Sequence, residues 1–346
     1  PPMSANRTMD YRSAGVDLER SELDKEGFKS LLGSTKDGLT LSDLGLFGGL
    51  YAVPPDVTDP VLVSSADGVG TKLKVAFRAN EHGTIGQDLV NHCVNDILVQ
   101  GARPLFFLDY LASSALEEGV AHEVVAGVAK ACKENGCALL GGETAQMPDF
   151  YGVGEYDLAG FIVGIVPRSE ILDPERVQSG DLLIALPSSG LHTNGYSLAR
   201  RILFEVGGLE IHDLVPGMGE TVVSALLRIH RSYLPVLGPE LPKGSVVALA
   251  HITGGGLPGN LPRSLPKGLG AEVQRESWEI PALFKALQEL GEVEESEMYR
   301  VFNMGVGMVV VASREEASSV LSRLQDSGED AWMLGEVREG AGVRFV

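Results

Sequence analysis

Short apolar runs rich in β-branched residues alternate along the chain with longer segments in which apolar residues recur every three or four positions. The short runs, which Gly or Pro residues bound, predict strands at residues 61–65, 104–112, 138–141, 157–166, 181–186, 245–252, 270–274, 307–312 and 331–337. The longer segments predict helices at residues 84–100, 116–135, 195–206, 220–237, 281–290 and 314–327. Strands and helices mixed in this way indicate an α+β fold.

The length of the chain and a break in the pattern predict two domains. At roughly 150 residues per domain, 346 residues correspond to about two domains. A polar stretch opens after Val166-Pro167-Arg168 and separates halves with similar predicted elements, so we expect domains at residues 1–168 and 169–346. Residues 1–50 are polar and Gly-rich, and we expect an arm or lid there rather than a core element.

Composition and charge narrow the class of protein. Hydrophobic residues make up 44% of the chain, enough to bury a sizeable core, which excludes a disordered chain. A net charge of −19 and the lack of a basic stripe argue against nucleic-acid binding. No apolar run reaches the ~18 residues of a membrane helix, and the first residues lack a secretory signal pattern, so we expect a cytoplasmic protein that binds no membrane.

The 43 glycines gather in turns between apolar runs, and the first turn carries candidate chemistry. Asp67-Gly68-Val69-Gly70-Thr71-Lys72 directly follows a predicted strand. Its backbone N–H groups, together with Thr71 and Lys72, could hold a phosphate, and Asp67 could hold Mg²⁺. The alternative is an ordinary hairpin turn with solvated charges. The chain contains no Walker A loop.

The predicted helix at residues 84–100 carries a polar stripe, because its polar residues recur three or four positions apart. They are Gln87, Asp88, Asn91, His92, Asn95 and Asp96. An ordinary exposed helix face carries Lys, Arg and Glu, whereas Asp, Asn and His are suited to metal binding or hydrogen bonding. Asp96 and Asp67 are therefore candidate ligands of one Mg²⁺. The alternative is a polar face packed in an interface.

A second glycine turn is predicted at Gly141-Gly142-Glu143-Thr144, where a strand runs into paired glycines, an acid and a hydroxyl. Paired glycines allow a backbone to approach a ligand closely. Glu143 could be a third acid near the metal or a general base. The alternative is a hairpin corner.

Two loops in the second half follow predicted strands, where ligand-binding loops often lie. The loop at residues 188–196 offers His192 and Asn194, although a lone loop histidine is often structural or solvated. The turn at residues 251–259 offers His251 and Thr253. It formally matches a dinucleotide motif, but Pro258 and Pro262 disrupt the helix that such a motif must open.

Covalent catalysis has little support in the sequence. The chain has no G-x-S-x-G motif, and Cys93, Cys132 and Cys137 lie in no activating or C-x-x-C motif. We therefore expect these cysteines in the core. The residues alone support a soluble two-lobed α+β protein with a Mg-nucleotide site, without identifying a substrate.

Taken together, these motifs closely resemble those of the phosphoribosylformylglycinamidine cyclo-ligase family, in the family's order and over nearly the whole chain. The matching segments are residues 11–17, 66–72, 93–96, 101–110, 141–148, 190–197, 251–256 and 297–307. The resemblance implies the two-domain α+β fold shared with selenophosphate synthetase. It also implies a homodimer whose N-terminal domains form a shared β-barrel. The implied reaction converts formylglycinamidine ribonucleotide and ATP into aminoimidazole ribonucleotide, ADP and phosphate through an iminophosphate.

The same resemblance implies roles for the motif residues. Mg²⁺ would be held by Asp67 and Asp96, with Glu143 nearby. ATP would be held by Gly68, Gly70, Thr71, Lys72, Gly141, Gly142 and Thr144. The substrate would face His192, Asn194, His251, Thr253, Gly254 and Gly255, and a histidine would move a proton. The selenophosphate relatives carry a metal-binding Asp at the position of His251, and that role does not transfer because neutral imidazole is a poor Mg²⁺ ligand.

Two other functions fit part of the pattern. The first is another ATP-dependent enzyme of the superfamily, such as a selenophosphate synthetase. The absence of a reactive Cys/Sec-plus-Lys motif near the N-terminus, and the presence of His251-Ile252-Thr253-Gly254-Gly255-Gly256, argue against it. The second is a non-catalytic ATP-binding dimer, against which the intact Asp67, Lys72, Asp96 and Glu143 argue.

Overall fold

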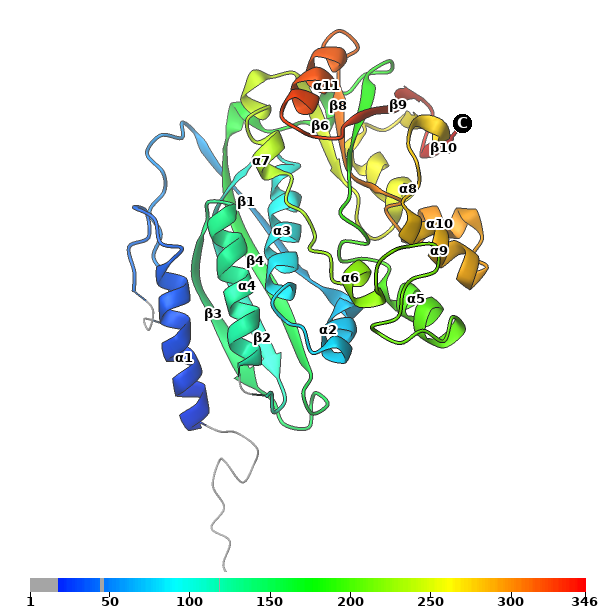
Figure 1. The fold of residues 1–346 in the computed structure, drawn as a ribbon. Helices are drawn as coiled ribbons and strands as arrows, with labels where there is room; N and C mark the ends of the chain where they lie inside the picture. The colour runs from blue at the N-terminus through cyan, green and yellow to red at the C-terminus, as the bar shows by residue number, and fades with distance from the viewer. Residues whose placement is uncertain (1–17, 44–46, 118) are drawn as a thin grey trace, which may run out of the picture.

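Two sheets organise the chain, each with helices packed on it (Figure 1). The computed structural model describes residues 18–43, 47–117 and 119–346, and of residues 18–25 only the backbone. The motif at residues 11–17 thus lies outside the described residues. None of the described helices combines the length and hydropathy needed to cross a membrane.

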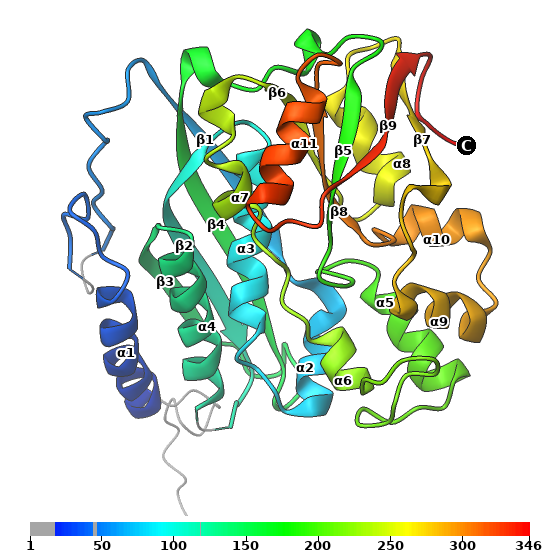
Figure 2. The ribbon, with the colours of Figure 1, turned by 45° about the horizontal axis from the view of Figure 1, so that its top comes forward.

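The N-terminal sheet has the strand order β1-β4-β2-β3, in which only β2 and β3 are parallel. Its strands are β1 (Pro60–Gly68), β2 (Arg103–Ser113), β3 (Ala138–Gln146) and β4 (Tyr156–Pro167). Its helices are α1 (Leu18–Gly33), α2 (Leu73–Ala79), α3 (Ile85–Leu98) and α4 (Val120–Glu134). The α3 and α4 helices cover one face of the sheet, and α1 packs beside α4 (Figures 1 and 2).

The C-terminal sheet has the order β10-β7-β9-β5-β8-β6 and is antiparallel except for β10 and β7. Its strands are β5 (Leu182–Pro187), β6 (Val246–His251), β7 (Leu269–Val273), β8 (Val306–Ala312), β9 (Trp332–Glu339) and β10 (Val343–Phe345). The helices of this half are α5 (Tyr196–Arg200), α6 (Val222–Leu226), α7 (Leu234–Leu237), α8 (Gly256–Asn260), α9 (Ala282–Gly291), α10 (Glu295–Val301) and α11 (Ala317–Asp326).

The buried strand β8 shows why the strand predictions succeed. Its apolar run is buried at every position, because α7 and α11 cover one face of the sheet and α8 covers the other. Each predicted strand lies on an observed strand, and the α+β prediction is confirmed. The domain boundary predicted near residue 168 falls in the connection between β4 and β5. The sequence analysis did not predict α2, α8, α10 or β10, and α8 forms at Gly256–Asn260 although it contains Pro258.

Two predictions of local structure are wrong. Residues 18–33 form a helix rather than a simple arm, because Phe28 and Leu32, four positions apart, are buried in the core beside α4. The helix predicted at 220–237 is broken into α6 and α7 by residues 227–233. The apolar spacing of this segment is helical, but its backbone groups bond to side chains of α3 instead.

Residues 228–233 belong to the C-terminal half but lie along the polar stripe of α3, which belongs to the N-terminal half. We call them the interdomain segment because they connect the two halves by hydrogen bonds. The Asp88 carboxylate accepts a hydrogen bond from the backbone N–H of His230 at 2.7 Å. The amide of Asn91 donates to the carbonyl of His230 at 2.8 Å. Asn95 donates to the carbonyl of Arg231 at 2.9 Å and accepts from the N–H of Tyr233 at 2.9 Å. Much of the stripe is therefore a polar face packed in an interface.

The α3 and α4 helices pack closely at Gly86, which has no side chain to keep them apart. A Cβ built on Gly86 would lie 2.2 Å from the carbonyl oxygen of Val124 and 2.4 Å from the nitrogen of Val128. Backbone atoms cannot move aside as a flexible side chain can, so this position requires glycine.

We expect the Gly86→Ala substitution to lower the free energy of unfolding by about 1–3 kcal/mol, because it forces α3 and α4 apart. Chemical denaturation measures the change. Gly83→Ala is the matched control, since a Cβ there meets nothing within 4 Å. Equal stability of the two variants would show that the helices do not rely on this close approach.

Candidate active site

A cleft of ≈ 900 Å³ lies between the two domains. One wall comes from β1 and α3, and includes Ser65, Asp67, His92 and Asp96. The other wall comes from β6, the glycine turn after it, α8 and the short helical turn at Leu261–Ser264. That second wall includes Leu249, Ala250, His251, Thr253, Gly254, Asn260, Arg263 and Ser264, and Asn194 also lines the cleft.

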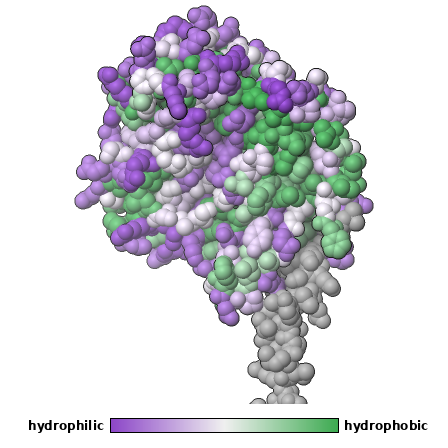
Figure 3. Space-filling view, turned by 180° about the vertical axis from the view of Figure 1, so that it is seen from behind, coloured by the Kyte–Doolittle hydropathy of each residue, from purple (hydrophilic) through white to green (hydrophobic). Residues whose placement is uncertain are grey.

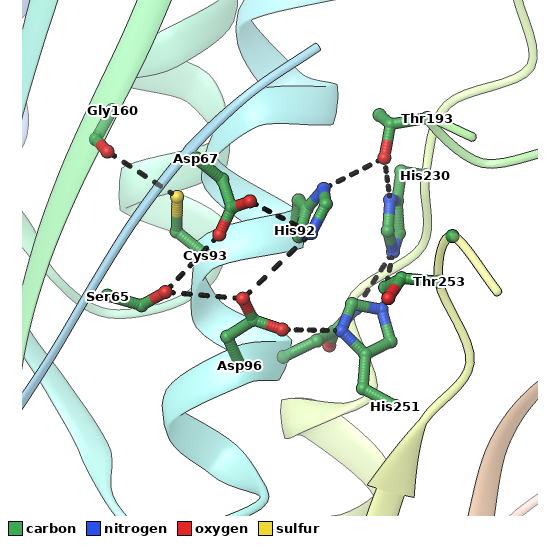
Figure 4. A network of polar contacts seen from close by, with 12 residues as sticks. Ser65, Asp67, His92, Cys93, Asp96, Gly160, Thr193, His230, His251 and Thr253 are labelled. Carbon is green, nitrogen blue, oxygen red and sulfur yellow. Dashed lines mark hydrogen bonds and ion pairs between the residues drawn. The ribbon is translucent and has the colours of Figure 1, made fainter. Parts of the chain in front are cut away.

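Asp67, at the end of β1, and Asp96, on α3, face one another on the first wall and form the carboxylate pair (Figure 4). The hydroxyl of Ser65 lies 3.3 Å from Asp67 Oδ2 and 3.2 Å from Asp96 Oδ2. Burial and the neighbouring Asp96 raise the pKa of Asp67 to about 7. Burial also acts to raise the pKa of Asp96, but the hydrogen bond and charge of His251 outweigh it and hold that pKa below its usual range.

The electrostatics of the carboxylate pair favour a shared proton or a cation. Two carboxylates this close cannot both be ionised without a compensating charge. The structure brings Asp67 and Asp96, the two residues expected to share one Mg²⁺, into contact. Carboxylate oxygens at a cleft are the ligands that Mg²⁺ prefers, so this pair fits that ion.

Four histidines from distant parts of the chain form a buried histidine cluster behind the carboxylate pair. They are His92, His192, His230 and His251. Burial lowers the pKa of each imidazole, which keeps these rings neutral near pH 7. His92 and His251 line the cleft, whereas His192 and His230 lie behind it.

A hydrogen-bonded path runs through this cluster from one carboxylate towards the other (Figure 4). His251 Nδ1 lies 2.8 Å from Asp96 Oδ1, and His251 Nε2 lies 3.0 Å from His230 Nε2. The Thr193 hydroxyl then lies 3.2 Å from His230 Nδ1 and 2.8 Å from His92 Nδ1. His92 Nε2 ends the path 3.6 Å from Asp67 Oδ1. Such a path holds each ring in one orientation.

The nitrogens of His192, His230 and His251 are near enough to suggest a metal site, but the rings do not fit one. The rings of His192 and His230 stack with centroids 4.0 Å apart and planes 16° apart. Because the lone pairs of imidazole lie in the ring plane, those of two stacked rings run parallel rather than converge on an ion. The cluster is therefore a packed hydrogen-bonding unit.

Lys72 does not reach the cleft. Its side chain is fully buried, and its ammonium donates to the Asp88 carboxylate at 2.8 Å. It also donates to the carbonyls of His192 at 3.2 Å and Arg228 at 2.7 Å. These three bonds use every proton of the ammonium, so the phosphate contact predicted for Lys72 is not available in this structure. Lys72 instead joins α3 to two segments of the C-terminal half.

The other residues of the first glycine turn, 68–71, do not line the cleft. Gly70 has φ +58°, a left-handed conformation that favours glycine. Thr71 Oγ1 lies 2.9 Å from the hydroxyl of Ser197, and Gly68 ends β1. Because β1 leads into a short helical turn and α2 instead of a returning strand, the hairpin alternative is wrong.

The second glycine motif lies at the far edge of the N-terminal sheet. Gly141, Glu143 and Thr144 are on β3, and the strands β4 and β2 separate it from β1. Within one chain, Glu143 is therefore not beside the carboxylate pair, contrary to our expectation. The hairpin-corner alternative is also wrong, since β3 continues to Gln146. Gly142 is needed because a Cβ there would lie 2.7 Å from the carbonyl oxygen of Asp109.

Of the six residues predicted to face the substrate, four line the cleft and two do not. Asn194, His251, Thr253 and Gly254 line the cleft, whereas His192 is buried behind it and Gly255 is the N-cap residue of α8. The amide nitrogen of Asn194 is buried and finds no hydrogen-bond partner in the described part of the chain. Sequence reasoning missed His230, Asn260 and Arg263.

Comparisons with known proteins agree with this geometry. Residues 48–166 match the AIR synthase related protein N-terminal domain, and residues 178–346 match its C-terminal domain. The chain is 52% identical over 337 residues to the phosphoribosylformylglycinamidine cyclo-ligase of Sorangium cellulosum (strain So ce56), with 97% of each covered. It is 50% identical over 329 residues to that of Trichlorobacter lovleyi, covering 95% of this chain and 94% of the relative.

Solved structures share the fold at lower identity. Thiamine-monophosphate kinase from Stenotrophomonas maltophilia K279a has a TM-score of 0.69 and 20% identity, covering 91% of this chain and 94% of its own. The hydrogenase maturation protein HypE of E. coli has a TM-score of 0.66 and 19% identity, covering 94% and 93%. T. maritima PurL complexed with FGAR has a TM-score of 0.59 and 18% identity, covering 84% of this chain and 44% of that chain. The expected superfamily fold is confirmed.

We expect the Asp67 carboxyl to titrate near pH 7 in the metal-free protein, far above the ordinary aspartate value of about 3.9. The folded state then binds this proton more tightly than the unfolded chain, so the contribution of Asp67 to stability falls as pH rises between those two values. Carboxyl-carbon NMR measures the titration.

The Asp96→Asn variant should lower the pKa of Asp67, because it removes the neighbouring negative charge. Asp109→Asn is the control, since burial raises the pKa of Asp109 to about 7 on another strand. An Asp67 midpoint that does not move in Asp96→Asn would contradict the coupling of the pair.

Proposed function

The chain belongs to the phosphoribosylformylglycinamidine cyclo-ligase family, and from this we propose that it closes the ring of aminoimidazole ribonucleotide. The substrate is formylglycinamidine ribonucleotide, and ATP is converted to ADP and phosphate in this step of purine biosynthesis. The protein is a cytoplasmic ligase that forms a C–N bond. The observation that carries the proposal is the carboxylate pair beside His251 in the cleft between the two domains.

The chemistry explains why ATP is needed. An amide oxygen is a poor leaving group, so the γ-phosphoryl group of ATP is first transferred to it, giving an iminophosphate and ADP. The amidine nitrogen of the same molecule then attacks the activated carbon. A C–N bond forms, the C–O bond breaks, phosphate leaves and the nitrogen loses a proton. Because both reacting groups belong to one molecule, holding them in place lowers the barrier by as much as several kcal/mol.

Asp67 and Asp96 are the residues that would hold Mg²⁺. When bound, the ion neutralises charge on the phosphates of ATP. The Ser65 hydroxyl orients the pair through its contacts with both carboxylates, and His251 holds Asp96 in its ionised form.

The proton released during ring closure needs an acceptor facing the cleft. His251 and His92 both line it and are neutral, so we assign proton transfer to these two rings. His192 stacks on His230 behind the cleft, and we assign it a positioning role. The substrate lies against Asn194, Thr253 and Gly254.

A homodimer would bring the remaining motifs to this site. The face of the N-terminal sheet away from α3 and α4 exposes Leu62 and Phe161, and Figure 3 shows hydrophobic residues gathered on that side. If two such faces pack to form the shared barrel, the β3 edge of one sheet meets the β1 edge of the other. Gly141-Gly142-Glu143-Thr144 of the partner subunit would then lie close to Gly68, Gly70 and Thr71, which would hold the phosphates of ATP.

The direct experiment is to incubate the purified protein with MgATP and formylglycinamidine ribonucleotide. We expect aminoimidazole ribonucleotide and ADP in equal amounts. Asp67→Asn should lower kcat by at least about 100-fold, since loss of a supporting group alone costs 10- to 100-fold at metal sites. Asp326→Asn, at an exposed aspartate at the end of α11 and outside the cleft, is the control. No ring product from the wild type would exclude the proposal, and normal turnover by Asp67→Asn would exclude the metal assignment.

The dimer has a separate test. Phe161→Glu should convert the protein to a monomer, because it places a charge in the middle of the packed sheet face. Light scattering after gel filtration measures the mass. Val206→Glu, another exposed apolar position in the C-terminal half, should remain dimeric. A wild type that is already monomeric would rule out the proposed packing.

A further inference from the structure

The two walls of the cleft carry charges of opposite sign. The N-terminal wall carries the carboxylate pair, while the C-terminal wall carries Arg263, which is the only Lys or Arg that lines the cleft among the described residues. Arg263 belongs to the short helical turn Leu261–Ser264, which follows α8. The cleft therefore has a direction, and a substrate with one anionic end would bind in one orientation only.

Arg263 brings an uncompensated positive charge to the cleft. It forms no ion pair with any residue that the structure describes, and its hydrogen bond goes to the neutral Asn260 Oδ1 at 3.3 Å. Two arginines of intermediate burial in the same half have acidic partners: Arg231 has Glu329 at 2.6 Å, and Arg323 has Glu240 at 2.8 Å. In a chain with 47 acidic and 28 basic residues, Arg263 is exposed at the cleft wall and no acidic side chain that the structure describes compensates its charge, so its guanidinium is available to a ligand that supplies the negative charge.

Asn260 ties Arg263 to the glycine turn. Its amide nitrogen donates to the carbonyls of Gly254 at 3.1 Å and Gly256 at 2.9 Å, and it lies 3.3 Å from that of Thr253. The Thr253 hydroxyl in turn donates to Asn260 Oδ1 at 3.2 Å. One buried amide thus holds the turn and the guanidinium in a common frame.

A second unsatisfied donor lines the same cleft. The amide nitrogen of Asn194 is fully buried and has no hydrogen-bond partner within the described ranges. A buried N–H without a partner is costly, and a ligand oxygen would satisfy it. The unpartnered amide of Asn194 and the uncompensated charge of Arg263 thus line one cleft.

We infer that Arg263 binds the phosphomonoester of the substrate ribonucleotide. This inference rests on the proposed function. The amide oxygen must meet the γ-phosphoryl group of ATP, which the carboxylate pair would hold through its cation on the N-terminal wall. The unreactive phosphate end of the substrate is then directed to the C-terminal wall. Guanidinium is the side chain best suited to such an anion, because it donates two parallel hydrogen bonds to phosphate oxygens.

The test compares substrate affinity in three variants. Arg263→Met should raise the KM for formylglycinamidine ribonucleotide about 10- to 100-fold, as expected for losing a hydrogen bond between charged groups. The KM for ATP should stay unchanged, and kcat should change less than the KM for the ribonucleotide. Arg263→Lys should recover part of the loss, since it keeps the charge. Arg176→Met, at an exposed arginine outside the cleft, is the matched control.

Binding of the phosphate-free nucleoside of the same substrate distinguishes the loss of a phosphate contact from general damage to the protein. The wild type should bind the nucleotide more tightly than the nucleoside by calorimetry without ATP, and Arg263→Met should bind the two alike. A raised KM for ATP, or an unchanged preference for the nucleotide in both Arg263 variants, would overturn the assignment. Because calorimetry requires no turnover, an inactive wild type would reject the proposed function and leave the binding comparison to decide the subsite.

Discussion

The polar stripe of α3 needs hydrogen-bond partners, and the backbone of the interdomain segment provides them. Asp88 is the centre of this arrangement, because its carboxylate accepts from both Lys72 and the N–H of His230. Removing one member of such a buried group would leave another uncompensated. The contact sets the distance between the domains, and therefore places Asp96 on one wall of the cleft against His251 on the other.

The division of work along α3 follows from its helical geometry. Asn91 and Asn95 hold the interdomain segment, whereas His92 and Asp96, each one position further on, turn towards the cleft. A step of one residue rotates a side chain by about 100° around the helix. One helix can therefore bind the second domain and supply the catalytic carboxylate at once. Rigid support of this kind keeps a charged pair in place without a covalent link.

Local patterns in the sequence were sufficient for the sheets, because a strand such as β8 is apolar at every position. They failed for residues 227–233, whose conformation depends on Asp88, a residue 142 positions away from His230. The carboxylate pair could be inferred from the family's motifs. His230 could not, since no local spacing marks it. Lys72 was misjudged because its burial depends on carbonyls from the other domain.

The same long separation has a consequence for the biosynthesis of the protein. The ribosome releases α3 well before the interdomain segment has been made, and until then Asp88, Asn91 and Asn95 lack their final partners. These side chains stay hydrated until the interdomain segment has been synthesised. The last steps of folding thus occur late in translation, and splitting the chain near residue 168 would yield two fragments that each lack part of a shared interface.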